Sequence, residues 1–329
     1  MTEASSTTVG GLSELAVLAR IFPRLPDADA AIVGPGDDAA VISAPDARFV
    51  VTTDMMVHGP DFRLAWSTPF DLGWKAAATN LSDVAAMGAV PTALVVALAV
   101  PPSLDVSVVE GFADGLRAAC EALSPGCGVV GGDLSASDTL TVAVTAFGDL
   151  QGRAPVLRSG ARPGDVVALA GELGLAAEGL GLLFHAGVDA QGRPDAELAA
   201  GLRLRHPSAI DAQLAPTPPI GAGPAAAIGG ATAMLDVSDG LSLDAARIAR
   251  SSGVGIDFDS VELGDDIERA LGGGEDHGLL ATFPPESVVP APFRVIGRVT
   301  EGSGTVSVDG TPHDAVGWDP YSGWDGAAG

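Results

Sequence analysis

Short apolar runs and longer segments of helical periodicity alternate along the first half of the chain. Residues 49–53 and 92–100 are rich in apolar and β-branched side chains, and residues 139–150 alternate polar with apolar positions, so all three are predicted strands. Residues 67–87 combine a Ser/Thr cap candidate, a proline and apolar residues at helical spacing, and residues 106–123 repeat that spacing. The pattern predicts a mixed α/β unit.

The second half carries a similar pattern. Residues 165–170 predict a strand that turns into a helix at Gly171, and residues 235–251 predict a strand, a turn and a helix. Residues 216–230 are rich in Pro and Gly, whereas residues 305–308 alternate apolar with polar positions as a strand does. This half is therefore also predicted to be α/β.

A stretch of Gly, Arg and Pro at residues 152–164 separates the two patterns. With 329 residues, the chain is long enough for two domains. We place the boundary near Arg153, which gives domains 1–152 and 153–329.

The formal net charge of −25, from 42 acidic and 17 basic residues, repels nucleic acid and anionic lipid, so neither is an expected partner. The first eleven residues lack the basic-then-apolar order of a signal peptide, and the longest apolar run, at 93–100, has only the length of a strand. A cytoplasmic location is therefore expected. Cys120 and Cys127 have no metal-ligand spacing and are predicted to pack in the core.

Several acids stand beside glycine or hydroxyl residues, mostly at the ends of predicted strands. These elements lie at residues 36–38, 52–54, 80–83, 131–133, 236–240 and 273–276. Clustered carboxylates are costly unless a cation compensates them, and oxygen ligands suit Mg²⁺ or Mn²⁺. Each element taken alone also fits an ordinary turn, because Asp and Gly tolerate unusual backbone angles. Taken together, they favour a metal and phosphate site.

The usual lysine-containing phosphate loops are missing from the sequence. It has no Gly-x-x-x-x-Gly-Lys-Ser/Thr loop and no His-Arg-Asp catalytic loop. Its single lysine, Lys75, follows Asp71 by four residues, so the plainest interpretation is an ion pair along one helix. Metal ions would then supply the positive charge that lysines supply elsewhere. Residues 171–174, at a strand-to-helix turn, are a further candidate phosphate cradle.

Read in order, the motifs of this chain resemble the thiamine-monophosphate kinase family. That family belongs to a superfamily that also holds aminoimidazole ribotide synthetase and selenophosphate synthetase. The resemblance spans nearly the whole chain and rests on the segments GDDAA at 36–40, KAAATNLSDVAAMGA at 75–89, GGD at 131–133, RSG at 158–160, DVSDG at 236–240 and GGED at 273–276.

The resemblance implies a role for each of several residues. Ligands to several Mg²⁺ ions would be Asp38, Thr52, Thr53, Asp54, Asp83, Asp133, Asp236 and Asp239. ATP would contact Gly132, Asp133, Arg158 and Ser238, and thiamine monophosphate would contact Asp61, Glu275 and Trp324. It further implies a homodimer that pairs through the strands of a mixed-sheet N-terminal domain.

The sequence departs from the family pattern at three places. Asp61 stands where many members carry a histidine, His277-Gly278 replaces an aromatic residue and an acid, and the chain ends in Gly-Ala-Ala-Gly.

The expected reaction moves the γ-phosphoryl group of ATP onto the phosphate of thiamine monophosphate. No residue is expected to act as general base, because a phosphate monoester with a second pKa of about 6 is already mostly dianionic at neutral pH. A sister ATP-dependent synthetase and a non-enzymatic cation-binding protein are the alternatives. The Asn-Leu-Ser-Asp and Gly-Gly-Glu-Asp motifs favour the kinase over the synthetase, and the acid spacing at 236–239 does not complete an EF-hand loop.

Overall fold

A four-stranded sheet forms the centre of the first half in the computed structural model, which describes residues 7–35 and 39–317. Its strand order is β3-β6-β4-β5, and only β4 and β5 pair in parallel. The strands are β3 (Val50–Val57), β4 (Val90–Val100), β5 (Gly128–Ala136) and β6 (Thr141–Asp149), and a separate ribbon joins β1 (Ala31–Val33) to β2 (Val41–Ile42). The three predicted strands of this half are confirmed.

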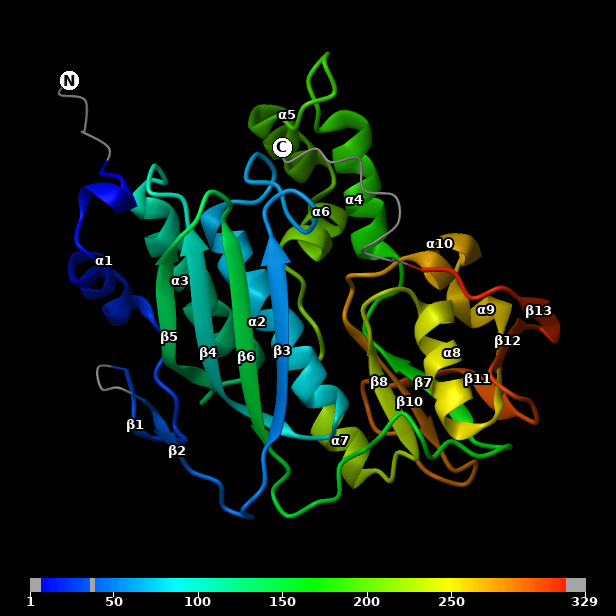
Figure 1. Ribbon diagram of the computed structural model, residues 1–329. Helices are drawn as coiled ribbons and strands as arrows, with labels where there is room; N and C mark the ends of the chain where they lie inside the picture. The colour runs from blue at the N-terminus through cyan, green and yellow to red at the C-terminus, as the bar shows by residue number, and fades with distance from the viewer. Residues whose placement is uncertain (1–6, 36–38, 318–329) are drawn as a thin grey trace.

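Two predicted helices, α2 (Pro69–Ala86) and α3 (Val106–Leu123), cover one face of this sheet (Figure 1). A Cβ at Gly73 would lie 2.0 Å from the Phe112 carbonyl oxygen, and one at Gly115 would lie 2.0 Å from that of Phe70. The two glycines therefore allow the helix backbones to touch. No helix of residues 7–35 and 39–317 covers the opposite face of the sheet, and Met55 on that face is 63 % exposed.

The second half is built on a seven-stranded sheet of order β13-β12-β9-β11-β7-β10-β8. Its strands are β7 (Val166–Ala170), β8 (Ala233–Val237), β9 (Gly255–Phe258), β10 (Gly278–Phe283), β11 (Arg294–Thr300), β12 (Thr305–Val308) and β13 (Thr311–His313). Helix α8 (Leu241–Ser252) packs on one face, near α9 (Ser260–Leu263) and α10 (Ile267–Gly272). On the other face, Ala168 and Ala281 join the same core as α2, so the two halves share a continuous interior.

Three helices form a smaller group beside the cleft that is described below. They are α4 (Leu175–Ala186), α5 (Ala196–Arg205) and α6 (Pro207–Leu214), and they enclose Trp66, Leu183 and Ile210. The sequence pattern predicted neither α5 nor α6. The Pro- and Gly-rich stretch at 216–230 contains a helix, α7 (Ala222–Ile228), whose alanines pack against α2.

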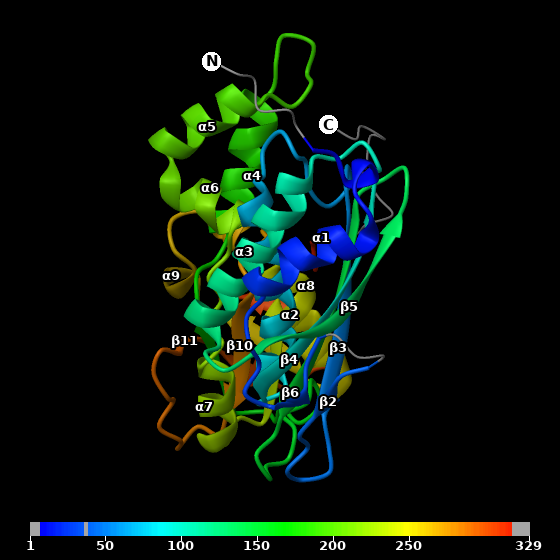
Figure 2. The same cartoon turned by 90° about the vertical axis from the view of Figure 1, so that its left-hand side faces the viewer.

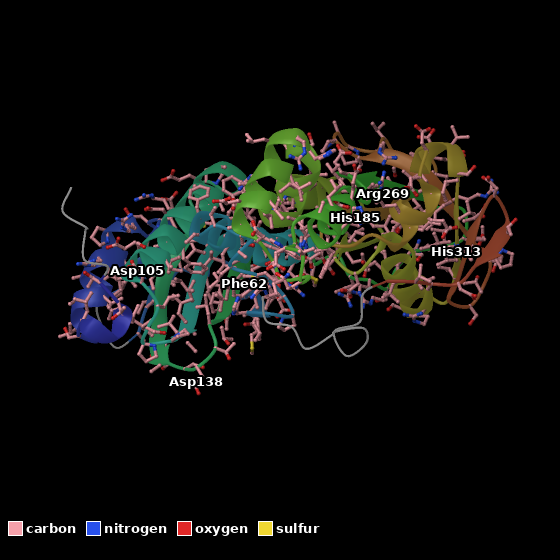
Figure 3. The ribbon with its side chains drawn as sticks, turned by 90° about the horizontal axis from the view of Figure 1, so that it is seen from above. Phe62, Asp105, Asp138, His185, Arg269 and His313 are labelled. Atoms are coloured by element: carbon pink, nitrogen blue, oxygen red, sulfur yellow. The ribbon has the colours of Figure 1, made fainter. Side chains whose placement is uncertain are left out.

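The N-terminal segment consists of short helices beside α3, namely η1 (Val9–Gly11), α1 (Glu14–Ile21) and η2 (Phe22–Arg24) (Figure 2). Seen from above, the molecule is elongated, with Asp105 and Asp138 toward one end, His313 toward the other and Phe62 near the middle (Figure 3). Among the described residues, no helix combines the length and apolar character needed to cross a membrane.

Candidate active site

A cleft of about 850 Å³ lies between the two halves, and both contribute acidic side chains to it. Asp54 and Asp61 come from β3 and the loop after it, and Asp83 comes from α2. Asp236 and Asp239 come from the end of β8 and the turn that follows. Residues that are more than 150 positions apart in the sequence therefore face one space.

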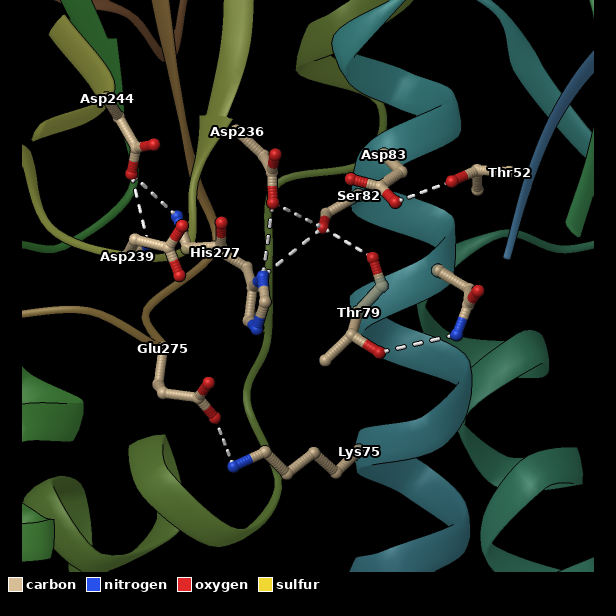
Figure 4. A network of polar contacts seen from close by, with 12 residues as sticks. Thr52, Lys75, Thr79, Ser82, Asp83, Asp236, Asp239, Asp244, Glu275 and His277 are labelled. Atoms are coloured by element: carbon tan, nitrogen blue, oxygen red, sulfur yellow. Dashed lines mark hydrogen bonds and ion pairs between the residues drawn. The ribbon is translucent and has the colours of Figure 1, made fainter. Parts of the chain in front are cut away.

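Helix α2 presents a polar row to this cleft. Lys75, Thr79 and Asp83 recur at intervals of four residues, which places them on one face of the helix, and all three line the cleft (Figure 4). The helix begins at a capping box in which Thr68 and Asp71 exchange hydrogen bonds with each other's backbone N–H groups. The cap fixes the start of the helix and with it the direction of this row.

Strand β3 places its alternate residues on opposite faces of the first sheet. Thr52 Oγ1 donates a hydrogen bond of 2.8 Å to Asp83 Oδ2, and the Asp54 backbone N–H donates one of 3.2 Å to Asn80 Oδ1, so Thr52 and Asp54 lie on the α2 side. Thr53 lies on the other side, where its hydroxyl donates to the Val144 carbonyl at 2.9 Å.

Burial and mutual repulsion raise the pKa values of the central carboxylates. Burial, with further contributions from Asp236 and Asp54, raises the pKa of Asp83 to about 7. Burial also raises the pKa of Asp54, and Asp236 and Glu275 add to that effect. His277 opposes the rise at both residues, but it does not offset the effect of burial.

The donor set of this acidic cluster fits a hard divalent cation, because carboxylate and hydroxyl oxygens are the ligands that Mg²⁺ prefers. Within residues 7–35 and 39–317, no three His, Cys, Asp or Glu side chains gather closely enough to hold one metal ion. Mg²⁺ commonly binds through one or two carboxylates together with substrate phosphates. The open arrangement of Asp54, Asp83 and Asp236 suits that mode.

The turn after β8 is held by two residues that sequence reasoning missed. Asp244 is almost fully buried and accepts hydrogen bonds from the backbone N–H groups of Ser238 at 3.1 Å and Asp239 at 3.0 Å. Arg247 pairs with Asp244 and also with Asp239, at 2.6 Å. In the sequence, the sign of this pair was the spacing of three residues between Asp244 and Arg247 in the helix after the motif at 236–240.

The prediction that Lys75 pairs with Asp71 is wrong. Asp71 caps its own helix and accepts two hydrogen bonds from Arg203, at 2.9 and 3.0 Å, so its oxygens already have partners. Lys75 instead forms an ion pair with Glu275, across the cleft on the turn before β10. Burial would raise the pKa of Glu275, but the Lys75 ammonium and the His277 ring together more than offset that effect, so the pKa lies below its ordinary value.

His277 was noted in the sequence only as a departure from the family pattern. Its Nδ1 lies 3.2 Å from Asp236 Oδ2 and 3.5 Å from Ser82 Oγ. Burial opposes protonation of the ring, yet contact with Asp236 raises the pKa of His277. The histidine thus joins Asp236 to α2 at the wall of the cleft.

The candidate phosphate cradle at residues 171–174 is occupied by a side chain of the protein itself. Asp276 Oδ1 accepts a hydrogen bond of 2.8 Å from the Ala176 backbone N–H, in the first turn of α4. A carboxylate at the start of α4 accepts hydrogen bonds from N–H groups that have no partner within the helix. The last acid of the Gly-Gly-Glu-Asp motif is therefore structural.

Other predicted site residues stand away from the cleft lining. Asp133 lies on β5, exposed, and accepts a hydrogen bond of 2.8 Å from Ser135 Oγ. Gly132 lies in the same cross-strand row as Asp54. Three strand spacings separate the two residues, which corresponds to about 14 Å. Arg158 is exposed in the segment between the two sheets.

The remaining predictions divide into two groups. Ser238, Asp61 and Glu275 line the cleft, and Asp61 accepts a hydrogen bond of 2.7 Å from the Val57 backbone N–H. Asp38 and Trp324 lie outside the described residues.

Fold and site together define an AIR synthase related protein. The family models described as AIR synthase related protein, N-terminal domain and C-terminal domain match residues 36–150 and 162–309. Thiamine-monophosphate kinase from Mycobacterium tuberculosis (strain CDC 1551 / Oshkosh) is 44% identical over 334 residues, covering 97% of this chain and 93% of the relative. The chain therefore belongs to the thiamine-monophosphate kinase family.

Solved structures of the family share this architecture. The thiamine-monophosphate kinase of Stenotrophomonas maltophilia K279a is 32% identical, covers 92% of this chain and 98% of its own, and superposes with a TM-score of 0.75. AaThiL complexed with AMPPCP and TMP is 35% identical, covers 86% of this chain and 90% of its own, and has a TM-score of 0.71.

Proposed function

We propose that this protein transfers the γ-phosphoryl group of ATP to the phosphate of thiamine monophosphate, giving thiamine diphosphate and ADP. The observation that carries the proposal is the cleft in which carboxylates of both halves face one another in a member of this kinase family. AaThiL, which is complexed with AMPPCP, a non-hydrolysable ATP analogue, and with TMP, supports the same pair of substrates.

The obstacle in this reaction is repulsion between two phosphate groups, because the acceptor phosphate is already a nucleophilic anion at neutral pH. Bound Mg²⁺ ions would neutralise this charge and align the attacking and leaving oxygens. Asp54, Asp83 and Asp236 would hold the ions from the two sides of the cleft. Thr52 would orient Asp83 through its hydrogen bond of 2.8 Å, which also favours the ionised form of this carboxyl group.

We assign the other residues according to the family pattern. Metal ligands would also include Asp38, Thr52, Thr53, Asp133 and Asp239. ATP would be bound by Gly132, Asp133, Arg158 and Ser238, and thiamine monophosphate by Asp61, Glu275 and Trp324. Opening of the Asp239–Arg247 ion pair would free Asp239 for a metal ion.

We further propose that two copies pair through the four-stranded sheet. Its helix-free face exposes Val51 and Met55 by 59 % and 63 %, and β3 and β5 are its two edge strands. Such a surface is typical of an interface. Thr53 and Asp133 lie on this face, so pairing would cover them and bring them into an assembled site.

We also keep residues 1–152 and 153–329 as the two domains, because β6 ends at Asp149 and β7 begins at Val166. The cytoplasm remains the proposed location, and neither nucleic acid nor a membrane is proposed as a partner, because the net charge of −25 repels nucleic acid and anionic lipid.

An assay with purified protein tests the reaction. Thiamine monophosphate, free thiamine and an aminoimidazole precursor are each incubated with ATP and Mg²⁺, and products are separated by chromatography. Thiamine diphosphate formed from the monophosphate alone supports the proposal. Turnover of the aminoimidazole precursor, with none of thiamine monophosphate, would assign the chain to the sister synthetases.

A further inference from the structure

The pairing of two strands in the second sheet places His277 beside Asp236. Strands β8 and β10 are antiparallel neighbours, and Gly278 lies opposite Val237. His277 comes directly before this pair, and its backbone N–H donates a hydrogen bond of 3.1 Å to the Val237 carbonyl. Because Asp236 precedes Val237 on β8, the backbone of His277 is fixed next to this aspartate.

The backbone conformation of His277 is unusual for its residue type. Its φ of +52° lies in the left-handed region, which residues other than glycine rarely adopt. Such a conformation persists only where the surrounding structure holds it, and it is common at functional sites. The turn before β10 is held at its start as well, since the Glu275 backbone N–H donates to the Ser238 carbonyl at 2.9 Å. The imidazole ring, which is only 5 % exposed, is therefore held in one place.

The carboxylate of Asp236 has two neighbours that could donate a hydrogen bond to it. His277 Nδ1 lies 3.2 Å from Oδ2, and Ser82 Oγ lies 3.3 Å from the same oxygen. The single hydroxyl proton of Ser82 also has the Thr79 carbonyl oxygen as an acceptor, at the shorter distance of 2.7 Å. His277 is therefore the main donor to Oδ2. Both contacts use Oδ2, which leaves Oδ1 to bind a ligand.

The donor role of Nδ1 is the same in both charge states of the His277 ring. A carboxylate that binds a cation is ionised and only accepts hydrogen bonds, so the proton has to be on Nδ1. The neutral ring with its proton on Nδ1 and the doubly protonated ring both meet this requirement. The contact with Asp236 therefore does not depend on the charge of the ring.

The second ring nitrogen indicates that His277 is more than a packing residue. Nε2 is buried and has no hydrogen-bond partner among the described residues, and the ring lines the cleft. A buried polar atom without a partner lowers the stability of the fold, and an apolar side chain of similar size would avoid this loss. The contact that Nδ1 makes with Asp236 is therefore the feature that an imidazole supplies and an apolar side chain does not.

We infer that His277 is a positioning residue for the metal site: Nδ1 holds Oδ2 of Asp236 and so orients the carboxylate, whose Oδ1 would bind a divalent cation. The inference rests on the proposed function, because it takes Asp236 as a metal ligand. Hydrogen bonds to metal-ligating carboxylates keep them in their binding geometry, and loss of such a bond commonly lowers metal affinity by about 10- to 100-fold.

Three substitutions at this position distinguish the two ring nitrogens. In His277→Asn an amide nitrogen can take the place of Nδ1, in His277→Gln it reaches the place of Nε2, and His277→Leu has neither donor. Asn also tolerates the left-handed backbone conformation. Binding of Mn²⁺ to the nucleotide-free protein, measured from the electron paramagnetic resonance signal of the free ion, gives the metal affinity of each variant. Thermal unfolding with a chelator present checks that each one is folded.

The expected pattern separates His277→Asn from the other two variants. His277→Leu and His277→Gln should bind Mn²⁺ about tenfold or more weakly than the parent, whereas His277→Asn should stay within about threefold. The Mg²⁺ concentration for half-maximal kinase rate should rise in the same two variants, while KM for thiamine monophosphate changes less than about twofold. If His277→Leu does not fold, the comparison of His277→Gln with His277→Asn carries the test.

His313→Leu is the matched control. Nε2 of His313 is likewise buried and without a partner in residues 7–35 and 39–317, but His313 lies on β13, at the opposite edge of the sheet from β8. This variant should bind Mn²⁺ as the parent does. Parent affinity in His277→Leu and His277→Gln would overturn the inference. A loss in His277→Asn but not in His277→Gln would also overturn it, because the role would then belong to Nε2.

Failure of this inference is distinguishable from failure of the proposed function, because Mn²⁺ binding needs no acceptor substrate. If the parent does not phosphorylate thiamine monophosphate but the variants show the expected Mn²⁺ affinities, the proposed function fails and the positioning role of His277 is supported. If the parent phosphorylates thiamine monophosphate and the His277 variants all keep its Mn²⁺ affinity, only the inference fails.

Discussion

Thr52 Oγ1 donates a hydrogen bond of 2.8 Å to Asp83 Oδ2 and so connects β3 to the cleft face of α2. This hydrogen bond lowers the pKa of Asp83 against the effect of burial. Thr52→Val should therefore weaken Mg²⁺ use, with about a tenfold higher Mg²⁺ concentration for half-maximal rate, as expected for loss of one hydrogen bond to a charged group. Initial rates over a Mg²⁺ titration measure this.

Thr92→Val provides the control, because Thr92 Oγ1 also makes one hydrogen bond within the same sheet, to the Phe147 carbonyl at 3.2 Å. It should leave the Mg²⁺ dependence unchanged. Equal Mg²⁺ dependence in the Thr52 and Thr92 variants would argue against a role of Thr52 at the metal site.

Asp83 should make the metal-free protein less stable as the pH rises from about 4 to 7. An unfolded Asp, with its pKa near 3.8, loses its proton in this range, whereas the folded protein retains it up to about pH 7, so the unfolded state is favoured. Asp83→Asn should remove this slope and gain roughly 2–4 kcal/mol at pH 7. Urea unfolding in the presence of a chelator, measured at several pH values, tests both statements.

The same variant should lose nearly all kinase activity, by a factor of about 100 or more, because removing a charged group that stabilises the transition state costs several kcal/mol. A variant that is more stable at pH 7 and yet inactive separates function from folding. Activity close to that of the parent would contradict the assignment of Asp83 as a metal ligand.

Asp244 should stabilise the turn after β8 without contacting a ligand itself. Burial raises its pKa to about 6, against the opposing effect of Arg247, and it accepts the two backbone hydrogen bonds that shape residues 238 and 239. Asp244→Ala should destabilise the fold by roughly 2–4 kcal/mol, because it leaves buried donors and a charged partner unpaired. Thermal and urea unfolding measure the loss.

Asp46→Ala is the comparison for Asp244, since Asp46 pairs with Arg48 at the surface. Removal of an exposed pair costs little, so Asp46→Ala should lose far less stability than Asp244→Ala. If the two variants lose equal stability, the turn does not depend on the buried carboxylate.

Val51→Asp should separate the proposed dimer into single chains. Val51 is 59 % exposed on the helix-free face of the first sheet, and a charge placed in an apolar interface is strongly unfavourable. Sedimentation measures the mass of the variant. Val288→Asp, at a position 89 % exposed in the second half, should leave the mass unchanged, and a parent protein that sediments as a monomer would contradict the proposed pairing.

Much of the fold could be predicted because local patterns and tertiary packing agree in the first half. The helix over 106–123 is confirmed at both ends, since Asp105 caps its start and apolar residues recur on its buried face. Helices α5 and α6 could not be predicted, because their packing surface, which includes Trp66, comes from a distant part of the chain. Helix α7 could not be predicted either, because the Pro and Gly residues around it obscure the helical pattern.

The sequence by itself determined the acidic motifs, and with them the family and the oxygen-rich chemistry of the cleft, because residue types and short spacings are local properties. Only the tertiary structure decided which charges meet. Lys75 has Asp71 four residues before it on its own helix, yet it pairs with Glu275, 200 residues away, because Arg203 already neutralises Asp71. Ion pairs depend on distance in space, and packing of the two halves sets that distance.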